Sequence, residues 1–159
     1  MQVIKPTLLL TIAMAAFSVM QCGNHTPPEY RRLFALPVQQ QALEFKKYPL
    51  DQQLDIYVHA IEDVEPPATQ FGTFLAANGK KVIPLLLNKL KEEKSDRRRF
   101  YLIAVFYQMH TEHCSLKDER EVVETISAVI REMKDSTYRG LCEVYLKAIR
   151  EQPGAGPPC

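Results

Sequence analysis

Hydrophobic side chains recur along most of this chain with the spacing of an α-helix. The clearest stripe returns every three or four residues and therefore lies on one face of a helix: Leu50, Leu54, Tyr57, Val58, Ile61 and Val64. Similar stripes occupy residues 83–90, 122–133 and 138–149. Strict alternation of apolar and polar residues, the pattern of a half-buried strand, is not sustained in the sequence. The pattern predicts an all-α fold.

The segment 100–109 is apolar almost all round, and only Gln108 in it is plainly polar. A helix without a polar face belongs in the interior, so we expect this one to run through the middle of the molecule. Its ten residues are too few to cross a bilayer. Residues that favour helix N-caps precede three of the predicted helices: Ser95 or Asp96, Ser115 with Asp118, and Asp135.

Two of the predicted helix pairs resemble units of the HEAT-repeat family. In such units a proline stands early in the first helix, and an Asp followed by an Arg stands around the turn into the second. The matching residues are Pro84, Asp96 and Arg98 or Arg99 near 80–110, and Asp135 and Arg139 near 117–151, without the proline. The spacing of 41 residues from Arg98 to Arg139 lies within the roughly 40 to 47 of such repeats. The resemblance implies antiparallel helix pairs stacked as a short HEAT-like α-solenoid, and an irregular helical bundle is the alternative.

Residues 1–21 are typical of a secretory signal peptide. Lys5 gives the segment a positive start, and the 14 residues from Thr7 to Met20 carry no charge. A spanning helix would need about 20 apolar residues. We therefore expect export to the periplasm or outer envelope.

Cys22 is the candidate for lipid attachment, because Val19 to Cys22 resembles the bacterial lipoprotein box at its first and last positions. Met20 and Gln21 depart from that box. A cut at the A-x-A-like site Ala13 to Ala15 would instead give a secreted protein, although the apolar run before it is short. Acylation of Cys22, simple secretion and a buried Cys22 thus stay open. A lipid anchor at Cys22 is the membrane contact that we expect.

The rest of the chain is predicted to hold one domain. We expect a linker over 22–36, a single helical domain over 37–151 and a disordered tail, rich in Pro and Gly, over 152–159. Lys5 is the only charged residue before Cys22, so 19 basic residues face 19 acidic residues in the remainder. A net charge of zero provides no overall field that would attract nucleic acid, and we expect no nucleic-acid partner.

Three cysteines follow Cys22, and they allow three disulfide pairings. We expect Cys114 in a loop, Cys142 on an apolar helix face and Cys159 at the terminus. Cys114 with Cys142 is one candidate disulfide among the three pairings. Burial of Cys142 as a small apolar residue is the alternative.

The segment 110–114, His-Thr-Glu-His-Cys, is the sharpest candidate for a metal or catalytic site. His110, His113 and Cys114 could ligate zinc, and Glu112 could move a proton. No Cys-x-x-Cys pair or His-Glu-x-x-His motif completes a ligand set. We interpret the segment as a polar loop after a buried helix, and we expect no metal and no cofactor.

One polar helix face and one basic stretch are further candidate sites. The helix face carries Asp51, Asp55, His59 and Glu62, and a solvated surface explains it. The basic stretch could meet anionic headgroups, but a solvated turn is the simpler interpretation: Lys89, Lys91, Lys94, Arg97, Arg98 and Arg99. Tyr107, Tyr138 and Tyr145 are expected to be core aromatics with hydroxyls in water.

Phosphate-binding loops and nucleophile elbows are absent from the sequence. We therefore expect an exported, non-catalytic helical protein that acts as a protein-binding or scaffold module in the cell envelope, not an enzyme. Two alternatives stay open. One is a metal-dependent hydrolase that uses His110, Glu112, His113 and Cys114, and the other is an inhibitor or immunity-type protein with one target.

Overall fold

The structure is a computed structural model that describes residues 21–22, of which only the backbone is placed, and residues 25–159. The predicted signal peptide falls almost wholly on residues 1–20, outside the described residues. The buried residues run from Thr26 to Ile149, so the described core is contained in the chain that follows Cys22. None of the described helices is long and apolar enough to span a bilayer.

Most of the described chain folds into helices, which confirms the all-α prediction. The helices are α1 (Pro28–Phe34), α2 (Val38–Phe45), α3 (Leu50–Glu62), α4 (Gln70–Ala76), α5 (Ile83–Glu92), α6 (Asp96–Glu112), α7 (Arg120–Glu132) and α8 (Ser136–Glu151). A 3-10 turn, η1, covers Gly79–Val82. Two short strands, β1 (Gln21–Cys22) and β2 (Val64–Glu65), pair in antiparallel fashion, with Cys22 opposite Val64.

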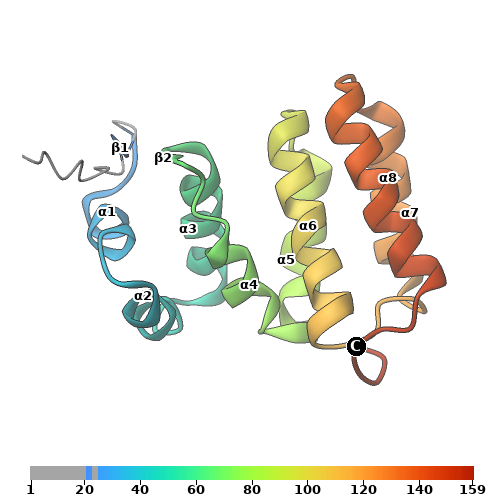
Figure 1. The fold of residues 1–159 in the computed structure, drawn as a ribbon, viewed down its shortest axis with the longest axis horizontal. Coiled ribbons are helices and arrows are strands. Elements are labelled where there is room, and N and C mark those ends of the chain that lie inside the picture. Colours follow the sequence, from blue (N-terminus) through green and yellow to red (C-terminus); the bar gives the residue numbers. More distant parts are fainter. Residues whose placement is uncertain (1–20, 23–24) are drawn as a thin grey trace, which may run out of the picture.

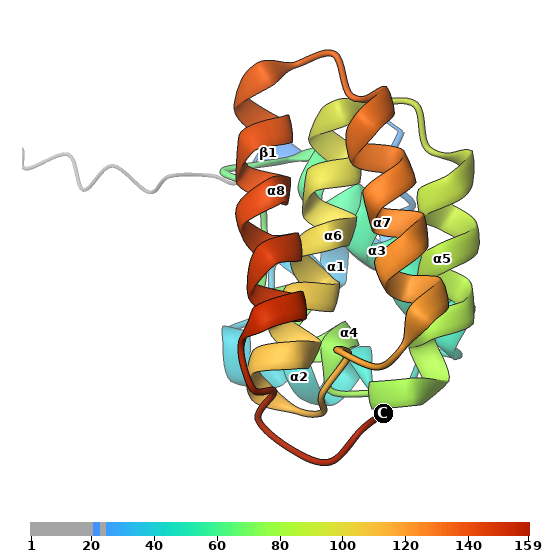
Figure 2. The ribbon, with the colours of Figure 1, turned by 90° about the vertical axis from the view of Figure 1, so that its right-hand side faces the viewer.

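Helix pairs follow one another along the long axis of the molecule, from α1 and α2 at one end to α7 and α8 at the other (Figure 1). Short turns make α5 antiparallel to α6 and α7 antiparallel to α8. α6 packs against α4 and α8, while α5 packs against α3 and α7. The helices therefore form two layers, with α6 and α8 in one and α5 and α7 in the other (Figure 2).

The middle of the molecule is built around α6, as its apolar sequence predicts. Leu102, Ile103, Val105, Phe106 and Met109 are all fully buried. Ser95 caps the helix, because its hydroxyl accepts a hydrogen bond from the Arg98 N–H. Local sequence and tertiary packing agree at this helix.

The turns before α6 and α8 are bonded to each other. The Asp96 carboxylate accepts hydrogen bonds from the backbone N–H groups of Lys134 and Asp135, at 2.7 and 2.8 Å. Asp135 in turn caps α8 by accepting from Thr137 and Tyr138. The predicted cap at Asp135 is thus confirmed, and Asp96 joins one helix pair to the next.

The prediction of a linker over 22–36 is wrong, because α1 lies within this range. Its side chains Tyr30, Leu33 and Phe34 are buried. The Phe34 and Phe71 rings pack with centroids 5.3 Å apart. The prolines before α1 do not mark a linker, because Pro28 occupies the first turn of the helix, where a missing N–H costs nothing. The domain thus begins before residue 37.

Two expectations near the C-terminus are also corrected. The box of Ser115 and Asp118 does not cap a helix, because α7 begins only at Arg120 and Glu119 precedes it without a side-chain cap. The tail 152–159, expected to be disordered, packs beneath α6 (Figure 1). It does so because backbone hydrogen bonds and a disulfide hold it to the segment after α6.

Candidate functional site

The outer side of α6 and α8 carries a row of half-buried aromatic side chains, which we call the aromatic face. It consists of Phe100, Tyr101 and Tyr107 on α6 and Tyr138 and Tyr145 on α8. Only one side of α6 packs into the core. Phe100, Tyr101 and Tyr107 recur at helical spacing on the opposite side, so they lie at the surface of the layer.

The rings of the aromatic face are stacked on one another. Tyr107 and Tyr145 lie nearly parallel, with centroids 4.5 Å apart and planes 9° apart. Phe100 stacks on the other side of this pair, 5.8 Å from Tyr145, and lies 5.5 Å from Tyr138. Burial, and then the neighbouring Tyr107, raise the pKa of Tyr145. The face is therefore a preassembled, neutral surface.

α8 extends the aromatic face with exposed aliphatic side chains. Leu141 is 43% exposed and Val144 is 63% exposed. At about 100° per residue, both fall in one sector of the helix with Tyr138 and Tyr145. Most charged residues of α8 fall in another sector: Arg139, Glu143, Lys147 and Arg150. Glu151, in the last turn, falls in the sector of Val144. From Tyr138 to Tyr145, one side of this helix is thus free of charge although it is open to solvent.

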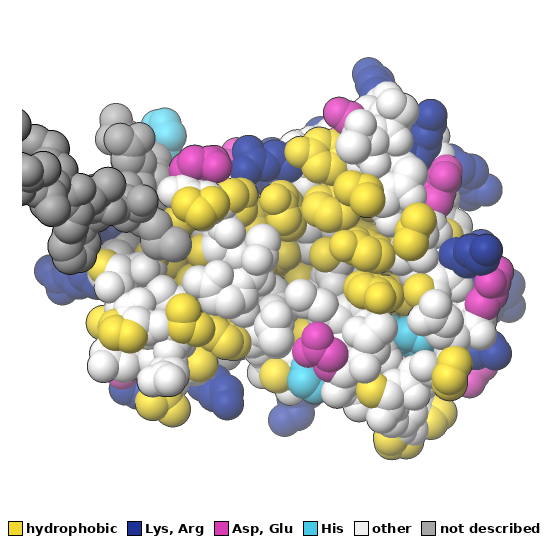
Figure 3. Space-filling view, in the orientation of Figure 1, with side chains coloured by type: hydrophobic (Ala, Val, Ile, Leu, Met, Phe, Trp, Pro, Cys, Tyr) yellow, Lys and Arg dark blue, Asp and Glu magenta, His cyan; other side chains and the backbone are white. Residues whose placement is uncertain are grey.

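The charge-poor surface continues on neighbouring segments. No charged residue lies between Pro66 and Gly79, the stretch that contains α4, or between Phe100 and Met109 on α6. Figure 3 shows hydrophobic side chains gathered over α6 and α8, with most Lys, Arg, Asp and Glu side chains around the edges of the view. The layer thus offers an extended surface of mixed apolar and uncharged polar groups.

Such a surface is suited to binding rather than to chemistry. Tyrosines combine a large apolar ring with a hydroxyl and are enriched among the residues that dominate protein interfaces. Interface centres are also depleted in charge. The aromatic face has both properties. The sequence predicted Tyr107, Tyr138 and Tyr145 as core aromatics with hydroxyls in water, and Tyr138 and Tyr145 do pack against the core. It did not indicate that their rings stack on the outer side of α6 and α8 beside Leu141 and Val144.

The segment His110 to Cys114 is not assembled as a ligand set. His110 is 1% exposed, and its Nδ1 accepts a hydrogen bond from the Leu116 N–H at 3.1 Å. Burial lowers the pKa of His110, an effect that the backbone of Gln152 partly offsets. Glu112 and His113 are exposed. Among the described residues, no group of three His, Cys, Asp or Glu side chains is placed to hold a metal ion.

The disulfide differs from the candidate pairing. Cys114 is bonded to Cys159, with Cα atoms 5.2 Å apart, and Cys142 is a free, fully buried thiol. Burial raises the pKa of Cys142 to about 12, so it stays a protonated, apolar residue. The alternative interpretation of Cys142 is the one that the structure supports. Cys159 reaches Cys114 because the tail turns back under α6.

Backbone contacts hold the tail together with the disulfide. Ser115 N–H donates to the Pro157 carbonyl and Cys159 N–H donates to the Ser115 carbonyl, at 3.0 and 3.1 Å. The approach is so close that a Cβ on Gly154 would lie 2.5 Å from the Ser115 Cα. Only glycine fits there. The tail therefore forms an ordered strap across the end of α6.

Of the four candidate residues on the polar face of α3, only Asp55 and His59 lie close to each other. The His59 Nε2 and the Asp55 carboxylate lie 4.0 Å apart. Asp51 is exposed, and Glu62 instead binds Arg98 on α6. The four residues therefore do not form one site.

A network that the sequence did not indicate holds the segment before α1 to α3. The Asp63 carboxylate lies 2.6 Å from the His59 Nδ1 and accepts from the Thr26 hydroxyl at 2.8 Å. Burial opposes its ionisation, but these two hydrogen bonds outweigh burial and lower the pKa of Asp63. The Tyr30 hydroxyl donates to Asp55 at 3.0 Å. These contacts fasten the N-terminal segment to the domain.

Part of the basic stretch braces the turn into α6. Arg98 binds Glu62 and the buried Glu93, at 2.7 and 2.9 Å. Arg99 is buried, donates through Nε to the Glu93 carbonyl at 2.8 Å and binds Glu132 at 3.1 Å. These two arginines therefore join neighbouring helices.

No protein-family model, curated protein or solved structure matches this chain.

Proposed function

We propose that this chain is an exported, non-catalytic helical protein that binds another protein through the aromatic face. The observation that carries the proposal is a solvent-accessible layer of stacked tyrosines and exposed aliphatic side chains, in which the stretch from Phe100 to Met109 on α6 has no charged residue. Monomeric proteins seldom leave large contiguous apolar patches open unless the patch is used.

The architecture supports the same proposal. Asp96 ties the turn of one helix pair to that of the next, which is the arrangement expected if α5 to α8 are two HEAT-like units. Stacked units of this kind display extended surfaces that serve as binding sites. The resemblance of the sequence to HEAT-like units supports binding as a class of function and names no partner.

The proposed compartment is the cell envelope. The export signal expected in residues 1–21 supports this location, and acylation of Cys22 would supply the anchor. Intact-mass measurement of the exported protein tests both points. A chain that begins at Cys22 and carries the added mass of acyl groups is expected, whereas an uncleaved chain in the cytoplasm would contradict the proposal.

Site-specific photo-crosslinking tests the binding proposal. A photoreactive residue is placed at Val144 on the aromatic face or, as a matched control, at Lys147 on the charged sector of the same helix. Both positions are exposed, so accessibility alone does not favour either. After irradiation of the intact envelope, a discrete adduct is expected from position 144 and not from position 147.

The pattern of adducts also separates two kinds of binding protein. One adduct that resists competition indicates a single tight target, as expected of an inhibitor or immunity-type protein. Several adducts indicate a scaffold. Absence of any adduct at 144, or identical adducts at 144 and 147, would contradict binding through the aromatic face.

A further inference from the structure

Among the residues that the structure describes, none covers the N-terminal end of the helix stack. A groove of about 450 Å³ lies between α1 and α2, with Leu33, Leu36 and Tyr48 among the residues that line it. Leu43 stands at its side and is 65% exposed, and Val38 on the same helix is 56% exposed. Glu29, Arg32, Gln40 and Glu44 complete the lining, so this end combines a hollow of mixed apolar and polar lining with an apolar projection.

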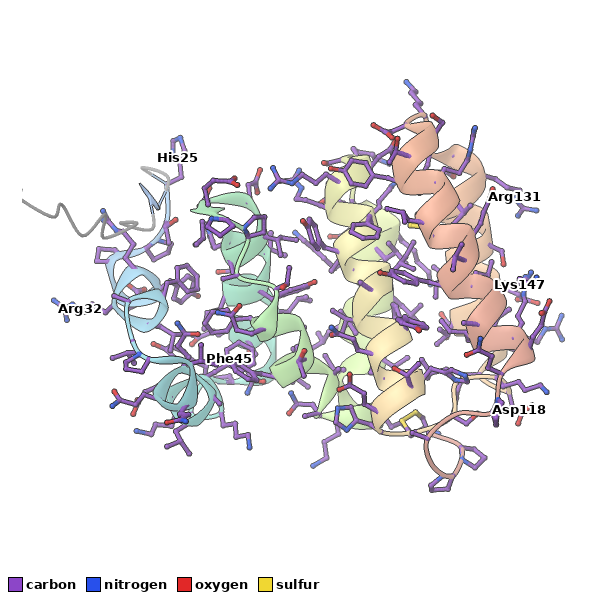
Figure 4. All side chains as sticks on the ribbon, in the orientation of Figure 1. His25, Arg32, Phe45, Asp118, Arg131 and Lys147 are labelled. Atoms are coloured by element: carbon purple, nitrogen blue, oxygen red, sulfur yellow. A yellow bond between two sulfur atoms is a disulfide. The ribbon has the colours of Figure 1, made fainter. Side chains whose placement is uncertain are left out.

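Charged side chains cover the outer side of the C-terminal end of the stack. Arg131 on α7 and Lys147 on α8 project outward from it (Figure 4). Terminal units of stacked-helix proteins need such a polar outer side, because no further unit covers them. On α2, the exposed side chains at Val38 and Leu43 are apolar instead of polar. An outer side of this kind is typical of a unit that another unit covers.

The charges beside the groove are of both signs. Glu44 is paired with Lys47 on the surface of the same chain. Glu29 and Arg32 stand three residues apart on α1 and line the groove. Neither makes an ion pair with a residue that the structure describes. Arg32 projects away from α1 into solvent (Figure 4). A covering surface with one acidic and one basic group would satisfy both.

We propose that the surface that covers this end is the same surface of a second copy, related by a twofold axis. A twofold contact requires a patch that is complementary to itself, in which residue i meets residue j and j meets i. The groove and the projecting Leu43 meet this condition, since each copy supplies one hollow and one projection. Glu29 and Arg32 meet it as well, since each acid would face the arginine of the second copy.

The proposed dimer leaves the binding surface free. The contact lies at α1 and α2, whereas the aromatic face lies on α6 and α8 (Figure 1). Each dimer therefore displays two aromatic faces, and a partner with two sites would gain avidity without any new contact. This inference does not depend on the proposed function, because the two surfaces are separate.

Sedimentation velocity on the chain from residue 22, with Cys22→Ser, tests the dimer. The wild-type sequence is expected to move from monomer to dimer as its concentration rises. Leu43→Glu is expected to raise the dissociation constant at least about tenfold, as for a buried anchor residue. Val144→Glu, an equally exposed site on the other surface, is the matched control and should leave the dimer intact. Circular dichroism verifies that each variant is folded.

Charge exchange gives the sharper test. Glu29→Arg alone and Arg32→Glu alone should each weaken self-association, because like charges then meet across the twofold axis. A mixture of these two variants should form heterodimers, since every contact again pairs opposite charges. A wild-type chain that stays monomeric at all concentrations, a Leu43→Glu variant as dimeric as wild type, loss of the dimer in Val144→Glu, or no recovery in the mixture would overturn the proposal.

Discussion

The two ends of this helix stack are held in different ways. At the C-terminal end, a disulfide, backbone hydrogen bonds and a strap that only glycine allows fasten residues 152–159 beneath α6. At the N-terminal end, the segment before α1 is held by the pairing of β1 with β2 and by the side chains of Thr26, His59 and Asp63. A disulfide closes the C-terminal end, which presents charge. The N-terminal end is held without a covalent cross-link and presents a groove lined by apolar and polar side chains.

This difference indicates where the molecule keeps a fixed shape and where it is built to meet other surfaces. The Asp96 carboxylate and Arg99 bond α5 and α6 to α7 and α8, so the aromatic face lies on the rigid half. A binding surface gains affinity when it is held in place before its partner arrives. The open groove, by contrast, lies between α1 and α2, which pack on α4 through Phe34, Phe45 and Phe71.

The largest effect on stability is expected from removal of the disulfide between Cys114 and Cys159. Cys114→Ser together with Cys159→Ser opens a loop closed over a sequence separation of 45 residues. By the chain-entropy estimate, this should lower the free energy of unfolding by about 2 to 4 kcal/mol. Denaturant titration measures the loss, and reduction of the wild-type protein should reproduce it. Equal stability of the oxidised, reduced and mutant proteins would show that the strap contributes nothing.

A somewhat smaller effect is expected from the bond between the turns. Asp96→Ala leaves the backbone N–H groups of Lys134 and Asp135 without their charged acceptor, which should cost about 2 to 3 kcal/mol. Asp118→Ala, at an exposed position near the strap (Figure 4), is the control and should change stability by less than about 0.5 kcal/mol. If the two variants were equally stable, Asp96 would not join the helix pairs.

At the N-terminal end the expected effect depends on pH. The pKa of Asp63 is lowered in the folded protein, so its ionised form stabilises the fold above pH about 4, and this contribution is lost as the pH falls through the folded pKa. Asp63→Asn should therefore cost about 1 to 2 kcal/mol at pH 7 and less at pH 3. Urea titrations at both pH values test this, with Asp51→Asn as the exposed control. A cost that did not shrink on acidification would contradict it.

The smallest effect on stability is expected at the open groove. Leu43→Gln removes an exposed side chain, so at dilutions where the chain is monomeric the free energy of unfolding should stay within about 0.5 kcal/mol of wild type. Denaturant titration at nanomolar and micromolar concentrations should then separate monomer stability from any gain through association. A large loss at nanomolar concentration would mean that Leu43 packs within its own chain.

The central helices could be predicted from the sequence, because the residues that favour helix formation and capping there are also the ones that the packing of the domain requires. The apolar run from Phe100 to Met109 demanded burial, and Ser95 and Asp135 had the side chains that cap helices. α1 was missed because its prolines resemble a linker, and the hydrophobic contacts of Phe34 that decide the matter come from α4.

The strap and the sites could not be predicted in the same way. Cysteine pairing depends on which loops meet, and composition suggested disorder where Gly154 is in fact needed for close packing. The aromatic face depends on which sides of α6 and α8 remain after neighbours are packed, so it became visible only when Tyr107 and Tyr145 were found stacked on the outside. The partnership of Asp63 with Thr26 likewise joins segments 37 residues apart.

The most direct test of the central claim is the affinity of the partner captured at Val144 for variants of the aromatic face. Titration with the purified partner should show that Tyr145→Ala weakens binding at least about tenfold, as expected for a central interface aromatic. Lys147→Ala, on the charged sector of the same helix, should stay within about twofold of wild type. Equal affinities for Tyr145→Ala, Lys147→Ala and wild type would contradict the claim that this protein acts through its aromatic face.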